Sequence, residues 1–306
     1  MFWIIVTALL IIFFLLGPVI FAWRNAKRSL RPNTISLENE IKWNKERGLW
    51  LDFDSYKTVP YEVKCKDGYI IHAMFVDNPD AKDTGRYVII CHGHTSNRYG
   101  AVKYANSYLK LGFNCIIFDA RGHGENAPAT CTLGEVESRD LMCVIEDAKS
   151  RYPDMKVLGL HGESMGSSTC LCAIRYDPPV DFIVSDCCFT RCYDIVKEGY
   201  GNLHMSFLAV IANAGAKVLY HVDLRDTCAI KYVENSKYPI LFIHGAGDTF
   251  IKPHNSERLR EAASKNGAYT ELIFVEGAGH ACSRYVAGFE AYTGYIENFL
   301  KKIGVL

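Results

Sequence analysis

Short apolar segments, separated by stretches of helix-like composition, constrain the fold of this chain more than any other feature. Continuous apolar runs of this length are typical of parallel strands buried on both faces of a sheet. Two earlier segments, 61–66 and 69–76, are joined by Asp67-Gly68, a pair that favours a β-hairpin. The sequence therefore predicts an α/β fold with eight strands, the last six at 87–91, 114–119, 156–160, 181–184, 239–244 and 271–276. The expected helices are 101–111, 132–151, 167–176, 255–266 and 285–302.

The overall composition is that of an ordinary globular protein. The chain has 306 residues, of which 22% are charged, and its formal net charge is zero. This length suits one large α/β domain with an appendage. A zero net charge gives no reason to expect a polyanion, so nucleic acid is not an expected partner.

The N-terminal segment departs from this composition. Residues 1–23 contain no charged side chain, and as a helix they would span roughly 33 Å, enough to cross a bilayer. A cleaved signal peptide is the alternative, but the segment has neither a basic start nor a small-residue cleavage site. Basic residues flank it only on the C-terminal side, which by the positive-inside rule places the following domain in the cytoplasm.

We therefore expect a single-pass anchor in the cell membrane over residues 1–23, a juxtamembrane connector over 24–49 and the main domain over 50–306. A short helix that begins at Asn33 or Ser36 and ends at Gly48 is expected within the connector. The twelve cysteines lie mostly in apolar segments, which suits a reducing compartment.

The segment Gly162-Glu163-Ser164-Met165-Gly166 lies between an expected strand and an expected helix. A Gly-x-Ser-x-Gly pattern in this place is typical of a nucleophile elbow, a sharp turn that exposes the serine hydroxyl above the sheet edge. The turn also directs the backbone N–H of Met165 to where an oxyanion would form. Ser164 is therefore the candidate nucleophile.

Two further polar residues follow expected strands. Asp248 comes after the strand at 239–244, and His280 after the strand at 271–276. A serine needs a base to take its proton, and the base needs an acid to orient it. The order Ser164, Asp248, His280 is consistent with such a triad. Asp186 is a rival acid, and His244 is expected to be structural.

A second oxyanion donor is expected at the end of the strand at 87–91. The His92-Gly93 turn there places the backbone N–H of His94 as the candidate. The pair His92 and His94 also permits a metal, but no carboxylate lies beside it. Cys187, Cys188, Cys192 and His204 resemble a zinc cluster without a standard spacing. No metal is expected.

The connection between the sixth and seventh strands is unusually long. Residues 189–238 far exceed an ordinary βα connection and are rich in aromatic and aliphatic side chains. This composition favours a small helical cap over the edge of the sheet. One ordinary helix followed by a long loop is the alternative.

Taken together, these motifs resemble the α/β-hydrolase superfamily over roughly residues 50–306, and more narrowly its bacterial membrane-anchored serine hydrolases. The matching motifs are Asp67-Gly68, His92-Gly93, Asp119-x-Arg121-Gly122-His123-Gly124, Gly162-x-Ser164-x-Gly166, Ser185-Asp186, His244-Gly245-x-x-Asp248 and Gly279-His280. The resemblance implies a mostly parallel eight-stranded sheet, hydrolysis through an acyl-enzyme and no cofactor. Cys187 and Cys188 depart from the small residues that are common there in relatives.

The expected activity is hydrolysis of carboxylic esters, with lipophilic acyl esters favoured by the apolar cap and the anchor. A serine peptidase or an acyltransferase with the same triad stays open, as does a non-catalytic membrane protein that binds acyl ligands or a partner. The sequence does not choose an acyl chain length, and this fold hosts all of these activities.

Overall fold

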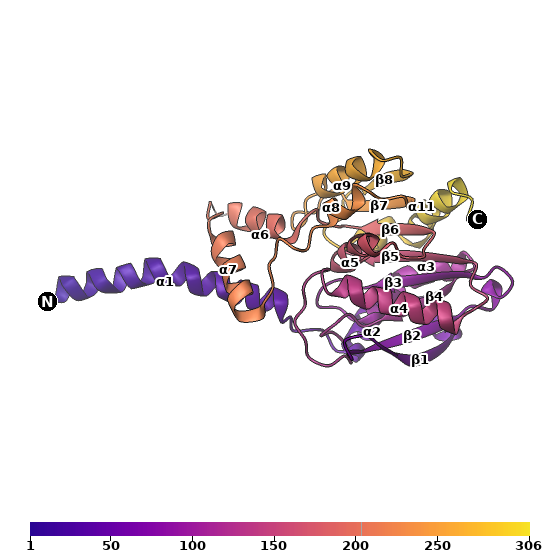
Figure 1. The fold of residues 1–306 in the computed structure, drawn as a ribbon, viewed down its shortest axis with the longest axis horizontal. Helices are drawn as coiled ribbons and strands as arrows, with labels where there is room; N and C mark the ends of the chain where they lie inside the picture. Colours follow the sequence, from indigo (N-terminus) through magenta and orange to yellow (C-terminus); the bar gives the residue numbers. More distant parts are fainter. Residues whose placement is uncertain (203) are drawn as a thin grey trace.

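The computed structural model describes residues 1–202 and 204–306, except for the side chains of residues 8–15. Eight strands form one sheet in the order β1-β2-β4-β3-β5-β6-β7-β8 (Figure 1). The first two strands, β1 (Lys57–Lys64) and β2 (Ile70–Asp77), pair antiparallel, and β2 also pairs antiparallel with β4. The other pairs are parallel and involve β3 (Arg86–Cys91), β4 (Asn114–Phe118), β5 (Val157–Glu163), β6 (Phe182–Asp186), β7 (Ile240–Gly245) and β8 (Thr270–Val275). The predicted mostly parallel eight-stranded sheet is confirmed.

Helices cover both faces of the sheet and bury the apolar strands between them. One core contains side chains of α3 (Val102–Lys110) and α11 (Phe289–Lys302). The opposite core contains side chains of α4 (Glu137–Arg151), α5 (Met165–Ala173), α8 (Ala229–Val233) and α9 (His254–Ser264). The helix expected at 285–302 is divided into α10 (Ser283–Ala287) and α11, because Gly288 takes a positive φ of 78°.

The N-terminal helix differs from its expected bounds. Helix α1 (Phe2–Leu30) does not stop at residue 23 but continues through the basic segment. Among the described residues, no helix is both long enough and apolar enough to cross a membrane, so the expected transmembrane helix is not supported. The side chains of residues 8–15, in the middle of the expected anchor, lie outside that description. Helix α2 (Leu37–Glu46) follows, and the Ser36 side chain caps it by accepting a hydrogen bond from the N–H of Asn39.

The long connection after β6 contains α6 (Cys192–Gly201), α7 (Leu208–Tyr220) and α8. Helix α7 packs along α1, so the first and the middle parts of the chain lie side by side (Figure 1). Ala22 of α1 is buried together with Leu208, Ala209 and Ala212 of α7. The N-terminal helix is therefore joined to the segment that the sequence predicts to be a cap.

Candidate active site

Ser164 lies in a strained turn between β5 and α5. Its φ of 53° and ψ of −111° fall where few non-glycine residues occur, at a typical cost of about 1–3 kcal/mol. A Cβ on Gly162 would overlap the backbone of Gly166, and a Cβ on Gly166 would overlap the carbonyl oxygen of Cys91. Only glycine fits at both positions, which explains the Gly-x-Ser-x-Gly pattern.

The three residues of the predicted triad lie together at one edge of the sheet. Ser164 follows β5, Asp248 follows β7 and His280 follows β8, and parallel strands end at the same edge. The Ser164 Oγ lies 2.9 Å from Nε2 of His280. Nδ1 of His280 lies 2.7 Å from Oδ2 of Asp248. With the proton on Nδ1, His280 donates to the carboxylate and its Nε2 accepts from the serine hydroxyl.

The environment of Asp248 keeps its side chain ionised. Burial alone would raise its pKa, but hydrogen bonds from His244 and His280 outweigh burial and hold the pKa well below its usual range. The N–H groups of Phe250 and Ile251 each donate to Oδ1 at 2.9 Å. The Asp248 carboxylate is thus fixed at one oxygen by the backbone and presents the other to His280.

Two rival residues lie close to the triad but make other hydrogen bonds. Asp186 is fully buried and accepts hydrogen bonds from the hydroxyls of Ser283 and Tyr292 at 3.0 and 2.8 Å, and burial raises its pKa to about 6. His244 is also fully buried, with Nδ1 2.7 Å from the Ser256 hydroxyl and Nε2 2.8 Å from the carbonyl of Ile251. Asp186 therefore connects β6 to buried hydroxyls of the core, while His244 forms a hydrogen bond with Asp248 and helps to hold it.

The loop after β3 lies directly against the elbow. A Cβ on Gly166 would stand 2.7 Å from the carbonyl oxygen of His92, so the two backbones touch. The His92 ring holds this loop, because Nδ1 lies 2.7 Å from the Gly93 carbonyl and Nε2 accepts the N–H of Ala120 at 2.9 Å. Burial lowers the pKa of His92 to about 4, which keeps the ring neutral. Both ring nitrogens are used, so His92 has no lone pair for a metal.

The N-terminal helix reaches this loop, which sequence reasoning missed. Nε2 of His94 lies 2.9 Å from the carbonyl of Ser29, near the end of α1. The adjoining carbonyl, that of Leu30, accepts the N–H of Cys131 at 2.9 Å. No spacing or motif in the sequence signals such contacts, because they join segments about 65 and 100 residues apart in the chain.

A buried acid also flanks the candidate nucleophile, Ser164. Glu163, the residue before Ser164, forms an ion pair with Lys103 of α3 and accepts a hydrogen bond from the Tyr104 hydroxyl. Both members of the ion pair are less than a tenth exposed. The pair fixes the end of β5 to α3, and sequence reasoning did not anticipate it.

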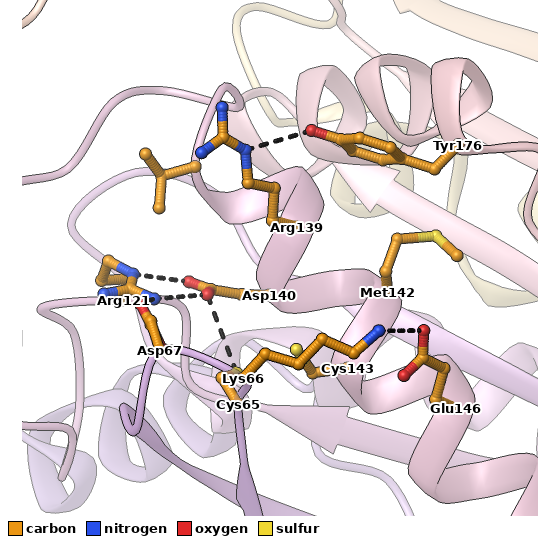
Figure 2. A pocket seen from close by; sticks show the side chains of 11 residues that line it. Cys65, Lys66, Asp67, Arg121, Arg139, Asp140, Met142, Cys143, Glu146 and Tyr176 are labelled. Carbon is orange, nitrogen blue, oxygen red and sulfur yellow. Dashed lines mark hydrogen bonds and ion pairs between the residues drawn. The ribbon is translucent and has the colours of Figure 1, made fainter.

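A cavity of about 400 Å³ lies away from the triad, between the β1–β2 turn and α4 (Figure 2). Arg121 lies at one side of it and bridges Asp67 and Asp140, at 2.8 and 2.6 Å. None of Ser164, Asp248 and His280 lines this cavity. These two ion pairs give Arg121 a structural role.

Comparison with known proteins places this fold in a class. Residues 87–203 match the family described as the alpha/beta hydrolase fold, and residues 200–293 match the dienelactone hydrolase family. The chain belongs to the α/β-hydrolase superfamily.

Among its relatives, the chain is similar to the Bacillus subtilis (strain 168) protein YqkD, with 29% identity over 273 residues and 86% of each chain covered. It is 33% identical over 135 residues to an Escherichia coli protein of 31.7 kDa from the traX-finO intergenic region, covering 42% of this chain and 47% of that one.

Two solved structures share the fold. The Pyrococcus furiosus esterase Pf2001 superposes with a TM-score of 0.66 at 22% identity, covering 85% of this chain and 96% of that chain. The Pyrococcus horikoshii acylaminoacyl peptidase superposes with a TM-score of 0.63 at 15% identity, covering 81% of this chain and 42% of that chain. One fold thus carries an esterase and a peptidase, and the particular reaction depends on the site.

Proposed function

We propose that this protein is a serine hydrolase that cleaves carboxylic esters through an acyl-enzyme. The observation that carries the proposal is the continuous line of hydrogen bonds from Ser164 through His280 to Asp248. A serine hydroxyl in this arrangement loses its proton to the imidazole as it attacks a carbonyl carbon. An ordinary structural serine has no need of the strained backbone found at Ser164.

In the proposed reaction, Ser164 Oγ attacks the ester carbonyl while Nε2 of His280 accepts the hydroxyl proton. The backbone N–H groups of Met165 and His94 donate to the resulting oxyanion, and the close contact between their two loops supports this pairing. The imidazolium then gives its proton to the departing alcohol. Water, with His280 again as base, hydrolyses the acyl-enzyme.

The substrate class we propose is a lipophilic acyl ester. Phe250 packs edge-on against His280 with ring centroids 5.0 Å apart, and its side chain is 67% exposed, so an apolar group borders the base. Helix α7 exposes Val210 and Val218, and α1 exposes Trp3 and Ile4. These exposed apolar side chains support association with a lipid phase.

A fluorophosphonate probe tests the nucleophile. We expect the probe to label the wild-type protein and to label Ser164→Ala not at all, because the probe reacts only with an activated serine. Ser206→Ala, which removes a hydroxyl from the α6–α7 connection, is the matched control and should label like the wild type. No labelling of well-folded wild type would contradict the proposal and favour a non-catalytic ligand-binding protein.

Turnover of esters graded by acyl chain length tests the substrate class. We expect the kcat/KM to rise with chain length over p-nitrophenyl and glycerol esters, because each buried methylene contributes about 0.8 kcal/mol. Turnover restricted to short soluble esters would contradict a lipophilic substrate. Faster cleavage of peptides than of esters would favour a peptidase instead.

A further inference from the structure

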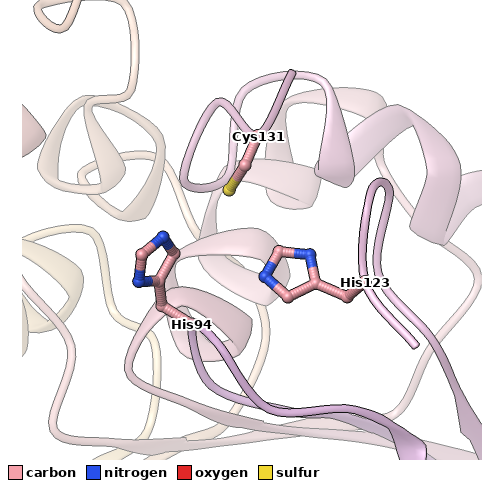
Figure 3. A group of neighbouring side chains, drawn as sticks. All are labelled: His94, His123 and Cys131. Carbon is pink, nitrogen blue, oxygen red and sulfur yellow. The ribbon is translucent and has the colours of Figure 1, made fainter. Parts of the chain in front are cut away.

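Three side chains with metal-binding atoms converge beside the elbow, outside the predicted triad. The ligand atoms of His94, His123 and Cys131 all lie within 4.8 Å of one another (Figure 3). Cys131 is fully buried, His123 is 1% exposed and His94 is partly exposed. His94 comes from the loop after β3, while His123 and Cys131 both come from the connection between β4 and α4, so the fold brings two loops together here.

Each of the two histidines donates one ring N–H to a backbone carbonyl, which leaves a lone pair on its other ring nitrogen. Nε2 of His94 donates to the carbonyl of Ser29 at 2.9 Å, so its Nδ1 carries the lone pair. Nδ1 of His123 donates to the carbonyl of Arg121 at 2.9 Å, so its Nε2 carries the lone pair. The N–H of Thr95 donates to that nitrogen at a long distance of 3.4 Å.

This arrangement is the one that metal-ligating histidines usually show. A ligating imidazole almost always donates its other N–H to a carbonyl or a carboxylate, which fixes the ring and its tautomer. Both histidines already do so with backbone carbonyls. If these histidines only held their loops in place, the hydrogen bonds to the carbonyls would be enough, and no thiol would be needed between the rings.

A fourth donor lies within reach. The Met165 thioether sulfur is 3.4 Å from the Cys131 thiol, and Met165 is 1% exposed. Two imidazoles, one thiol and one thioether make a soft donor set, which selects monovalent copper or zinc over magnesium or calcium. Tetrahedral ligand atoms at bond lengths of about 2.0–2.3 Å lie about 3.5 Å apart, so the side chains need to close inward by about 1 Å.

We propose that His94, His123, Cys131 and Met165 form a binding site for a thiophilic cation, with Cu(I) as the occupant. Binding replaces the Cys131 proton, which goes to solvent, and leaves a neutral Cu(I)–thiolate pair that can be buried. Zn(II) would leave a net positive charge there. Four basic side chains in and just after α1 line a cavity together with Thr95, the residue after His94, and this nearby positive charge disfavours a divalent ion more than a monovalent one.

The proposed site has a structural consequence that is separate from hydrolysis. Ser29 and Leu30 at the end of α1 accept hydrogen bonds from His94 and Cys131, so the occupied site would hold that helix to the main domain. Met165 also follows the nucleophile in sequence. Binding itself does not require the proposed hydrolase activity.

The test is anaerobic Cu(I) titration in competition with bicinchoninate, using the full chain. Cys143 and Cys282 are the cysteines that are not buried, so the starting protein is Cys143→Ser/Cys282→Ser, which removes the accessible thiols. We expect one Cu(I) per chain. Loss of one ligand should weaken binding by at least about 100-fold in Cys131→Ser, and likewise in His123→Gln. Cys172→Ser, a buried thiol outside the cluster, is the matched control and should bind normally.

If Cys131→Ser does not fold, His94→Gln gives the same test at a partly exposed position. The absence of one-to-one binding would overturn the proposal, and so would unchanged affinity in Cys131→Ser or, where that variant fails, in His94→Gln. A parallel Zn(II) titration with a chromophoric chelator decides the cation. Tighter binding of Zn(II) than of Cu(I) would overturn the assignment to copper.

Discussion

Two regions of the molecule bring distant residues together by different physical means. One is the triad edge, the edge of the sheet where Ser164, Asp248 and His280 lie, and the other is the contact between α1 and α7. At the triad edge, Ser164, Asp248 and His280 each follow a strand whose register with its neighbours is fixed by backbone hydrogen bonds. In the helix pair, small residues such as Ala22 and Gly215 allow two helices to approach, and no backbone bond sets their register. The first geometry follows from strand pairing, while the second depends on side-chain shape.

The largest expected effect is a difference in kcat between variants of the two carboxylates at the triad edge, Asp248 and Asp186. In Asp248→Asn, the amide no longer holds His280 in the tautomer that accepts the serine proton, so kcat should fall roughly 10⁴-fold. In Asp186→Asn, the amide oxygen still accepts one of the two hydroxyl hydrogen bonds. We expect esterase kcat there to stay within about tenfold of wild type, with a stability loss of about 1–2 kcal/mol.

Steady-state ester kinetics and urea unfolding of both variants check this difference. Wild-type turnover in Asp248→Asn would contradict the assignment of the acid. A loss in Asp186→Asn as large as that in Asp248→Asn, with an intact fold, would make Asp186 the acid instead.

The next effect tests the elbow. Gly166→Ala places a methyl group against the carbonyl oxygens of Cys91 and His92, and neither backbone atom can move without disturbing β3. We expect a loss of about 2–4 kcal/mol in the free energy of unfolding, as is usual when a core position is overfilled. Gly294→Ala on α11 is the control. A Cβ there meets nothing within 4 Å, so stability should rise by up to about 1 kcal/mol.

Urea unfolding measures both changes. Equal stability of Gly166→Ala and Gly294→Ala would show that the elbow backbone is not as closely packed as the structure has it.

The strand-edge geometry was predictable because its signals are local. Each apolar run ends in a short turn with glycine beside the polar residue, as in the segment from Gly245 to Asp248 and the one from Gly277 to His280. Parallel pairing then places those ends at one edge without further information. The predicted bounds of most strands agree with the structure within one or two residues, although β1 begins earlier, at Lys57.

The features that the sequence did not predict depend on contacts between distant segments, and no local sequence pattern marks such contacts. The apolar composition of residues 1–23 predicts a membrane anchor, but buried Ala22 and Ala26 pack toward the protein. The sequence pattern of an apolar helix face is the same whether lipid or another helix covers that face. The pairing of Lys103 with Glu163 joins residues 60 positions apart, and His94 likewise meets His123 and Cys131 of a later connection.

The smallest expected effect tests the contact between α1 and α7. A Cβ on Gly215 would stand 2.5 Å from Cδ1 of Trp23, a side chain that is 44% exposed and able to swing aside. Gly199 on α6 is the matched control, since a Cβ there meets nothing within 4 Å. Both changes to alanine gain up to about 1 kcal/mol of helix propensity, but Gly215→Ala must also displace Trp23.

We therefore expect Gly199→Ala to be more stable than wild type by up to about 1 kcal/mol, and Gly215→Ala to be close to wild type. Trypsin gives the sharper measurement, because α1 carries Arg24, Lys27 and Arg28 beside the contact. Cleavage there should be several-fold faster in Gly215→Ala than in Gly199→Ala, since a displaced helix opens more often. Equal cleavage rates would mean that Trp23 yields without loosening α1, and that the helix is held by the hydrogen bonds at Ser29 and Leu30 rather than by α7.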